Sequence, residues 1–209
     1  LCALARGDEN EAYVWRARTW PLRALTEEQY ASWEADGFVV VRGAVPLNLT
    51  RAAAAAIRAF VGADDADNAT WYAHTRDIYA EREADGVTKP LHGPAGMVQL
   101  YHHASLWAIR QWPAVHAAFA DLFGTARLWV TTDRAHFKPP EDARFPAWSD
   151  PGPVHKGLHW DVETAPRAWP VPFAVQGVVY LEDTSADMGA LRVVPGFRER
   201  FAAWSAARG

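Results

Sequence analysis

The pattern of hydrophobic and polar positions makes the N-terminal third of the chain helical. Thr26, followed by two glutamates and a glutamine, forms a capping-type start whose acidic first turn suits the helix dipole. We predict a helix from there to Gly37, where glycine can end it. An alanine-rich helix is predicted over residues 50–61 and an amphipathic helix over residues 105–123, closed by Gly124.

The rest of the chain is dominated by short runs of β-branched or alternating residues, which are typical of strands. Strands are predicted at residues 38–41, 97–101, 128–137, 158–162, 173–181 and 190–194. Residues 141–157, rich in proline and glycine, form a long connection of the kind that serves as a lid or binding loop. Helices followed by several short strands predict an α+β fold with a sandwich-like or barrel-like β core.

Composition narrows the functional class. The chain has 209 residues, enough for one buried core, and its 21 basic and 25 acidic residues give a net charge of -4, which argues against a nucleic-acid partner. Cys2 is the only cysteine, so no internal disulfide and no cysteine-based zinc site can form, and we expect a cytoplasmic location. No apolar run reaches the roughly 18 residues of a membrane span, so no membrane partner is expected either.

The strongest chemical signal is the tripeptide His159-Trp160-Asp161. On a strand, residues two apart point to the same face, so the imidazole and the carboxylate would converge. Together they form two-thirds of the facial triad that holds non-haem Fe(II). The alternative is a surface pair on an exposed strand. His155 and His159 have the spacing of two zinc ligands on a helix, but the glutamate of a metalloprotease motif is absent between them.

Several stretches of the sequence, in order, resemble the phytanoyl-CoA dioxygenase-like proteins. They are residues 25–29, 36–40, 96–103, 106–107, 110, 113, 128–130, 133–134, 137–140, 159–161, 175–184, 189–191 and 194–197. The resemblance implies a double-stranded β-helix core of the jelly-roll or cupin type with N-terminal and flanking helices. We therefore expect residues 25–209 to form the oxygenase domain, preceded by an extension of residues 1–24.

The resemblance implies a dioxygenase that uses Fe(II) and the co-substrate 2-oxoglutarate to hydroxylate a small organic substrate. By position, His159 and Asp161 would be the first two iron ligands. Related halogenases replace the carboxylate with a small residue, so Asp161 favours hydroxylation. The family's strand before the proline pair lines the 2-oxoglutarate site. There Arg134 is the candidate partner of a carboxylate, because its guanidinium can bind in a bidentate manner. Gln99 and Gln176 are further candidates, and the alternative for all three is an ordinary structural contact.

The sequence departs from the family pattern after His159, because no histidine follows to serve as the third ligand. The family's arginine for the far carboxylate of 2-oxoglutarate is also expected later than Gly209. We therefore expect a fragment that lacks the last strands of the domain and is inactive by itself. The alternative is a catalytically inactive β-helix protein that binds a ligand or a partner.

Overall fold

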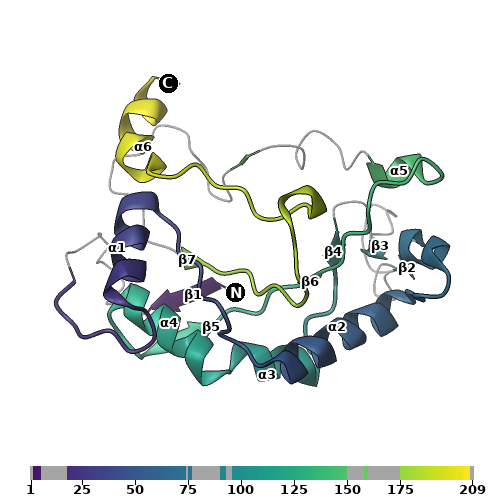
Figure 1. Cartoon of the computed structure of the whole chain (residues 1–209), viewed down its shortest axis with the longest axis horizontal. Coiled ribbons are helices and arrows are strands. Elements are labelled where there is room, and N and C mark those ends of the chain that lie inside the picture. The colour runs from purple at the N-terminus through teal and green to yellow at the C-terminus, as the bar shows by residue number, and fades with distance from the viewer. Residues whose placement is uncertain are drawn as a thin grey trace, which may run out of the picture.

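The computed structural model describes residues 2–5, 18–73, 75–76, 90–92, 96–149, 158–159 and 175–207. In this part of the chain, helices flank two small sheets, and the C-terminal segment crosses the molecule to its last helix (Figure 1). The helices are α1 (Glu27–Asp36), α2 (Leu47–Val61), α3 (Ala104–Arg110), α4 (Pro113–Phe123), α5 (Pro146–Ser149) and α6 (Phe197–Ala206). The described residues also contain the short 3-10 helices η1 (Asn68–Tyr72), which follows α2, and η4 (Ala186–Met188), which precedes α6.

Helix α1 begins and ends where the sequence predicts. The Thr26 side chain accepts a hydrogen bond from the backbone N–H of Gln29, and the Gln29 side chain accepts one from the backbone N–H of Thr26. This reciprocal capping box satisfies N–H groups that have no partner within the helix. At the other end Gly37 adopts a left-handed φ of 81° and donates its N–H to Trp33 O. The local sequence alone determines this element.

The predicted single helix over residues 105–123 is wrong. The chain forms two helices, α3 and α4, separated at Gln111 and Trp112, with Pro113 as the first residue of α4. Proline has no N–H to donate within a helix, and its ring excludes helical geometry from the residue before it. At the first helical position neither feature matters, so Pro113 starts a helix instead of interrupting one.

The described strands form two antiparallel sheets. They are β1 (Cys2–Ala5), β2 (Thr75–Arg76), β3 (Pro90–His92), β4 (Met97–Val98), β5 (Leu128–Val130), β6 (Ala135–His136) and β7 (Val175–Gln176). One sheet has the order β5-β1-β7 and the other the order β2-β3-β4-β6. Strand β1 lies in the centre of its sheet, so part of the expected N-terminal extension pairs with strands of the expected domain. The boundary at residue 25 stays a prediction.

Several strand predictions are wrong or too long. Residues 38–41 and 190–194 are not strands, and the predicted strand over residues 128–137 divides into β5 and β6, which belong to different sheets. The backbone of residues 38–41 and that of residues 190–194 each form a hydrogen bond with a side chain. Gln29 Nε2 donates to Val40 O at 3.3 Å, and Leu191 N donates to Tyr180 Oη at 2.8 Å. A β-branched run becomes a strand only where another strand is available to pair with it.

Strands β4 and β7 are shorter than the predicted 97–101 and 173–181. In the predicted strand at residues 158–162, the structure describes Leu158 and His159, and neither residue is in a strand. The remaining residues of that prediction lie outside the described part of the chain.

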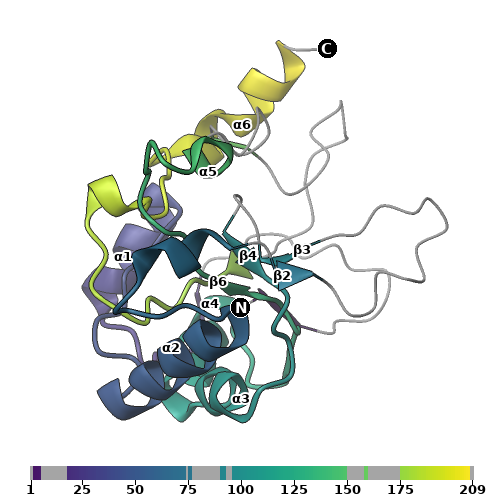
Figure 2. The ribbon, with the colours of Figure 1, turned by 90° about the vertical axis from the view of Figure 1, so that its right-hand side faces the viewer.

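Two clusters of buried side chains form the core. The first lies where α2 and α3 pack against β4 and β6, and its most buried members are Ala53, Val61 and Val98. Figure 2 shows α2 and α3 side by side below these strands. The second cluster lies between α1, α4 and β7 and includes Tyr30 and Phe123. The mixed α and β content agrees with the predicted class, and the double-stranded β-helix stays a prediction.

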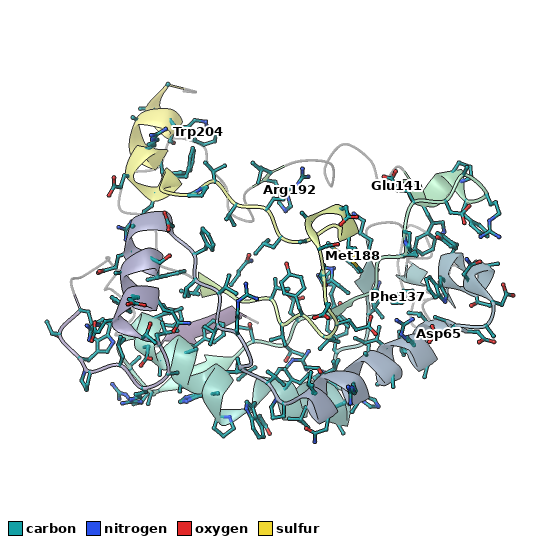
Figure 3. The ribbon with its side chains drawn as sticks, viewed as in Figure 1. Asp65, Phe137, Glu141, Met188, Arg192 and Trp204 are labelled. Atoms are coloured by element: carbon teal, nitrogen blue, oxygen red, sulfur yellow. The ribbon has the colours of Figure 1, made fainter. Side chains whose placement is uncertain are left out.

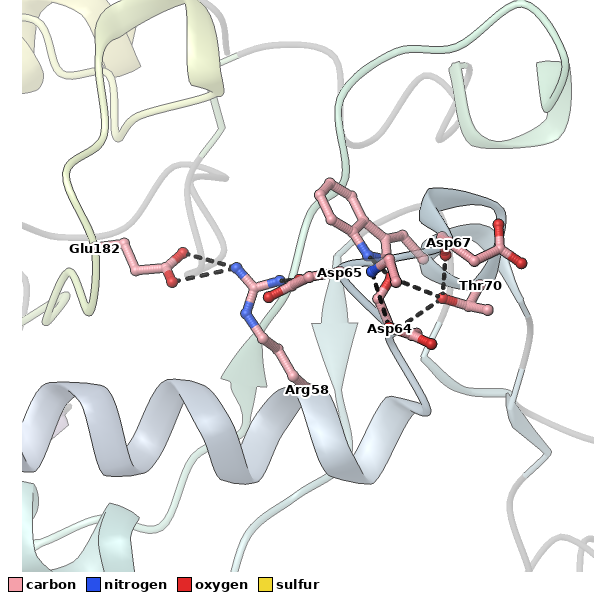
Figure 4. A network of polar contacts seen from close by, with 8 residues as sticks. Arg58, Asp64, Asp65, Asp67, Thr70 and Glu182 are labelled. Atoms are coloured by element: carbon pink, nitrogen blue, oxygen red, sulfur yellow. Dashed lines mark hydrogen bonds and ion pairs between the residues drawn. The ribbon is translucent and has the colours of Figure 1, made fainter.

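Arg58 connects the end of α2 to the C-terminal segment (Figure 4). Its Nη1 lies 2.8 Å from Asp65 Oδ1, and its Nη2 lies 3.2 Å from both carboxylate oxygens of Glu182. The guanidinium also lies over the rings of Trp71 and Phe137, with its carbon 5.7 Å and 5.5 Å from the ring centres. One cation thus contacts a segment that lies 124 residues away in the sequence.

Candidate functional site

The pairing of β4 with β6 creates one buried and one open face. Met97 lies opposite His136, and Val98 lies opposite Ala135. Val98 and Ala135 are only 0% and 8% exposed, so they form the core side of the ladder. Because side chains alternate along a strand, Met97 and His136 belong to the other face. The positions next to this ladder carry the sequence-predicted residues Gln99 and Arg134.

Arg134 lies on this open face, two residues before His136 and in contact with Met97. Its Nη1 lies 3.1 Å from Met97 Sδ, and its Nε lies 3.4 Å from Asp133 Oδ1. The side chain is 40% exposed. A thioether is a weak acceptor and the ion pair is solvent-exposed, so these contacts compete little with an incoming carboxylate. The guanidinium is therefore accessible to an anion.

His136 adds a titratable group to the same face. Burial, with a smaller effect of the Arg134 cation, lowers the pKa of His136 below its ordinary value, and the Asp133 carboxylate opposes the shift. The neutral imidazole is consequently favoured beside Arg134. The net charge of this face at neutral pH then depends on Arg134, Asp133 and the neighbouring Lys138.

The C-terminal segment passes close to the end of this face. A Cβ atom added to Gly189 would lie 3.6 Å from Lys138 Nζ, so the residue after η4 contacts the lysine side chain. Met188 of η4 and Phe137 next to β6 are labelled at this place in Figure 3. Met188 is 59% exposed. The Lys138 side chain thus lies between β6 and the C-terminal segment.

Gln176 lies in the other sheet, on β7 and opposite Cys2. The side chains of Gln176, Val178 and Tyr180 are all exposed, whereas Val175 is 4% exposed. Gln99 and Arg134 thus lie next to the paired strands β4 and β6, whereas Gln176 lies in a separate sheet.

The motif residues lie at the edge of what the structure describes. The His159 side chain is exposed, next to Leu158, which is 62% exposed. Asp161 lies outside the described residues, so the convergence of the two side chains stays a prediction. An exposed imidazole is accessible to a metal ion, and its nitrogen donor is of the type that Fe(II) accepts. Within the described ranges no group of three histidine, cysteine, aspartate or glutamate side chains is placed to hold a metal.

The first part of the long connection before the motif is anchored to the body of the protein. The Tyr72 hydroxyl donates to Pro140 O at 2.8 Å, and the Tyr72 ring stacks on Phe145 with centres 4.3 Å apart. Trp148 meets Tyr72 edge-on at 5.9 Å and is 7% exposed. These contacts hold residues 140–149 in place. The predicted lid or binding loop covers residues 141–157, and residues 150–157 of it lie outside the described part of the chain.

Sequence reasoning missed the structural role of Arg110. This arginine ends α3 and is 7% exposed, and its guanidinium bonds to main-chain carbonyls on both sides of the open face. Burial lowers the pKa of Arg110, and Asp133 opposes the shift. A signal was present in the sequence, because Arg110 follows Leu106 by one helical turn and so belongs to the buried face of the helix.

Comparison with known proteins decides the family. The sequence profile of phytanoyl-CoA dioxygenase (PhyH) matches residues 33–202, which is most of the chain. The chain belongs to the phytanoyl-CoA dioxygenase family. Searches of curated proteins and of solved structures gave no match. The family assignment confirms the resemblance that the sequence motifs predict.

Members of the PhyH family are generally Fe(II)- and 2-oxoglutarate-dependent dioxygenases with a cupin-like fold, and the mixed helices and small sheets of this chain do not contradict that fold. The matched region includes every candidate residue: Gln99, Arg134, His159, Asp161 and Gln176. Among the helices of the described residues, none has the length and apolar character required to cross a membrane.

Proposed function

We propose that this PhyH-family protein is a dioxygenase that uses Fe(II) and 2-oxoglutarate to hydroxylate a small organic substrate. The observation that carries the proposal is the family match over residues 33–202, which contains the His159-x-Asp161 motif. The imidazole and carboxylate of that motif are the donor types of a non-haem Fe(II) site.

In this proposal His159 and Asp161 hold the metal, which supplies the chemistry that couples decarboxylation of 2-oxoglutarate to oxidation of a C–H bond. The open face of β4 and β6 binds the co-substrate. Arg134 pairs with a carboxylate of 2-oxoglutarate through a charge-assisted, bidentate contact. Its weak partners, Met97 Sδ and the exposed Asp133 carboxylate, are readily displaced.

The two glutamines contribute polar contacts to the co-substrate. Gln99 follows β4 on the same face as Arg134, where its amide can hydrogen-bond to a carboxylate or keto oxygen. Gln176 contributes from β7, on the exposed face of that strand. The neutral imidazole of His136 limits the positive charge around Arg134, so Arg134 and the neighbouring Lys138 supply the cationic charge of the β4–β6 face.

The test measures formation of succinate from 2-oxoglutarate by the complete natural protein, with and without added Fe(II). We expect Fe(II)-dependent turnover that is abolished in His159→Ala and in Asp161→Ala. The matched controls are His102→Ala and Asp183→Ala, because both of these side chains are exposed and lie outside the motif. Both controls should retain the wild-type rate.

Undiminished succinate formation in Asp161→Ala would contradict the metal assignment. If the wild-type protein forms no succinate and does not retain Fe(II), the alternative of a ligand-binding or partner-binding protein is favoured instead. If the protein binds 2-oxoglutarate but forms no succinate, it retains a co-substrate site without catalysis. If it binds no 2-oxoglutarate, it has no such site.

A further inference from the structure

Arg110 is a buried cation whose hydrogen bonds go to the main chain. Its Nη1 donates to Tyr101 O at 2.6 Å, and its Nη2 donates to Asp133 O. The guanidinium carbon also lies 5.1 Å from the centre of the Trp107 ring. A buried charge is costly unless it is hydrogen-bonded, and the planar fork of arginine can satisfy two acceptors at fixed separation. Because both acceptors are carbonyls, Arg110 fixes the backbone of two segments.

These two segments are the continuations of β4 and β6. The ladder between the strands ends with the pair Val98 and Ala135. Continued by one residue, the same antiparallel register would place Gln99 opposite Arg134. Tyr101 follows two residues after Gln99, and Asp133 directly precedes Arg134. Arg110 thus connects the two segments by hydrogen bonds just beyond the last pair of the ladder.

We propose that Arg110 is a positioning residue of the co-substrate site, which holds the backbone of Gln99 and Arg134 at the separation that 2-oxoglutarate requires. The proposal rests on the function proposed above. Arg110 itself is on the core side, so it contacts no co-substrate. Lysine cannot replace it fully, because a single ammonium group lacks the rigid fork that reaches both carbonyls.

The test compares Arg110→Lys and Arg110→Ala with the wild-type protein in calorimetric titrations with 2-oxoglutarate. We expect the dissociation constant for 2-oxoglutarate to rise about 10- to 100-fold in both variants, as is typical when a residue that orients a binding group is lost. Guanidinium chloride at low millimolar concentration should partly restore the affinity of Arg110→Ala, and sodium chloride should not. Mn(II) binding, which depends on the motif, should stay within about twofold.

Arg51→Met is the matched control, because Arg51 is an exposed arginine on the surface of α2. It should bind 2-oxoglutarate as the wild-type protein does. Unchanged affinity in both Arg110 variants would overturn the proposal. If Arg110→Ala does not fold, Arg110→Lys decides the question, since it retains the charge and most of the side-chain volume.

Amide hydrogen exchange separates failure of this inference from failure of the proposed function. Loss of Arg110 should accelerate exchange in residues 99–101 and 131–134 and leave α1 unchanged. If the wild-type protein binds no 2-oxoglutarate, the proposed function fails, and exchange then decides the positioning role by itself. Faster exchange in those two segments would support that role, and unchanged exchange would overturn it.

Discussion

The carboxylate of Asp121 in α4 lies 2.9 Å from the backbone nitrogen of Leu25, a residue 96 positions earlier in the chain. The same carboxylate accepts hydrogen bonds from the backbone N–H groups of Arg23 and Ala24, each with a contact of 2.8 Å. Asp121 is 1% exposed. One buried anion therefore fixes the segment that leads into α1.

We expect Asp121→Asn to lower the free energy of unfolding by about 2–3 kcal/mol, because an amide cannot accept all of these bonds and hydrogen bonds to charged groups are the stronger ones. Urea denaturation followed by circular dichroism measures the change. Asp183→Asn, at an exposed position, is the control and should change the free energy by less than about 0.5 kcal/mol. A loss below about 1 kcal/mol in Asp121→Asn would contradict the assigned role.

Two glycines at helix ends give a matched pair of substitutions. Gly37 has a φ of 81° and a Cβ there would contact nothing within 4 Å, whereas a Cβ on Gly124, with a φ of 68°, would lie 2.8 Å from the Trp20 ring. Gly37→Ala should cost about 1–2 kcal/mol of stability through left-handed backbone strain alone. Gly124→Ala should cost about 1–3 kcal/mol more, because Trp20 must move. Equal losses in urea denaturation would show that Trp20 does not constrain this turn.

The ion pair between Arg58 and Glu182 should contribute little by itself. The Glu182 side chain is 61% exposed, so solvent screens the pair. A double-mutant cycle with Arg58→Met and Glu182→Gln should give a coupling energy of about 0.2–1 kcal/mol, and 1 M NaCl should reduce it. Arg58→Met alone should cost more than the coupling, since its contacts with Trp71 and Phe137 are also lost. A coupling that is large and insensitive to salt would contradict this view.

His136 should make the stability of the protein depend on pH. Its pKa is lower in the folded protein than the value of about 6.5 expected for the unfolded chain. The unfolded chain therefore binds more protons, and the stability that neutral His136 provides above about pH 6.5 is lost as the pH falls through the folded-state pKa. The unfolding free energy of the wild-type protein should decrease more steeply between pH 7.5 and pH 5 than that of His136→Gln. Parallel profiles in urea titrations would contradict the assigned pKa direction.

The sequence by itself determined the elements whose causes are local. The capping box of Thr26 and Gln29 and the glycine that ends α1 lie within a dozen residues of each other, so no distant contact is required to specify them. The family was also readable, because it depends on the order and spacing of short motifs across the chain.

Only the tertiary structure decided which β-branched runs became strands and which distant groups satisfy the buried charged side chains. Residues 38–41 have the composition of a strand, but they form no strand, and the Gln29 side chain donates a hydrogen bond to Val40 O. The charges of Arg110 and Asp121 are satisfied by main-chain groups outside their own helices, among them Asp133 O for Arg110 and the N–H of Leu25 for Asp121. Pairing and charge compensation are long-range interactions, and their energy depends on which segments meet in space, which no local pattern of residues contains.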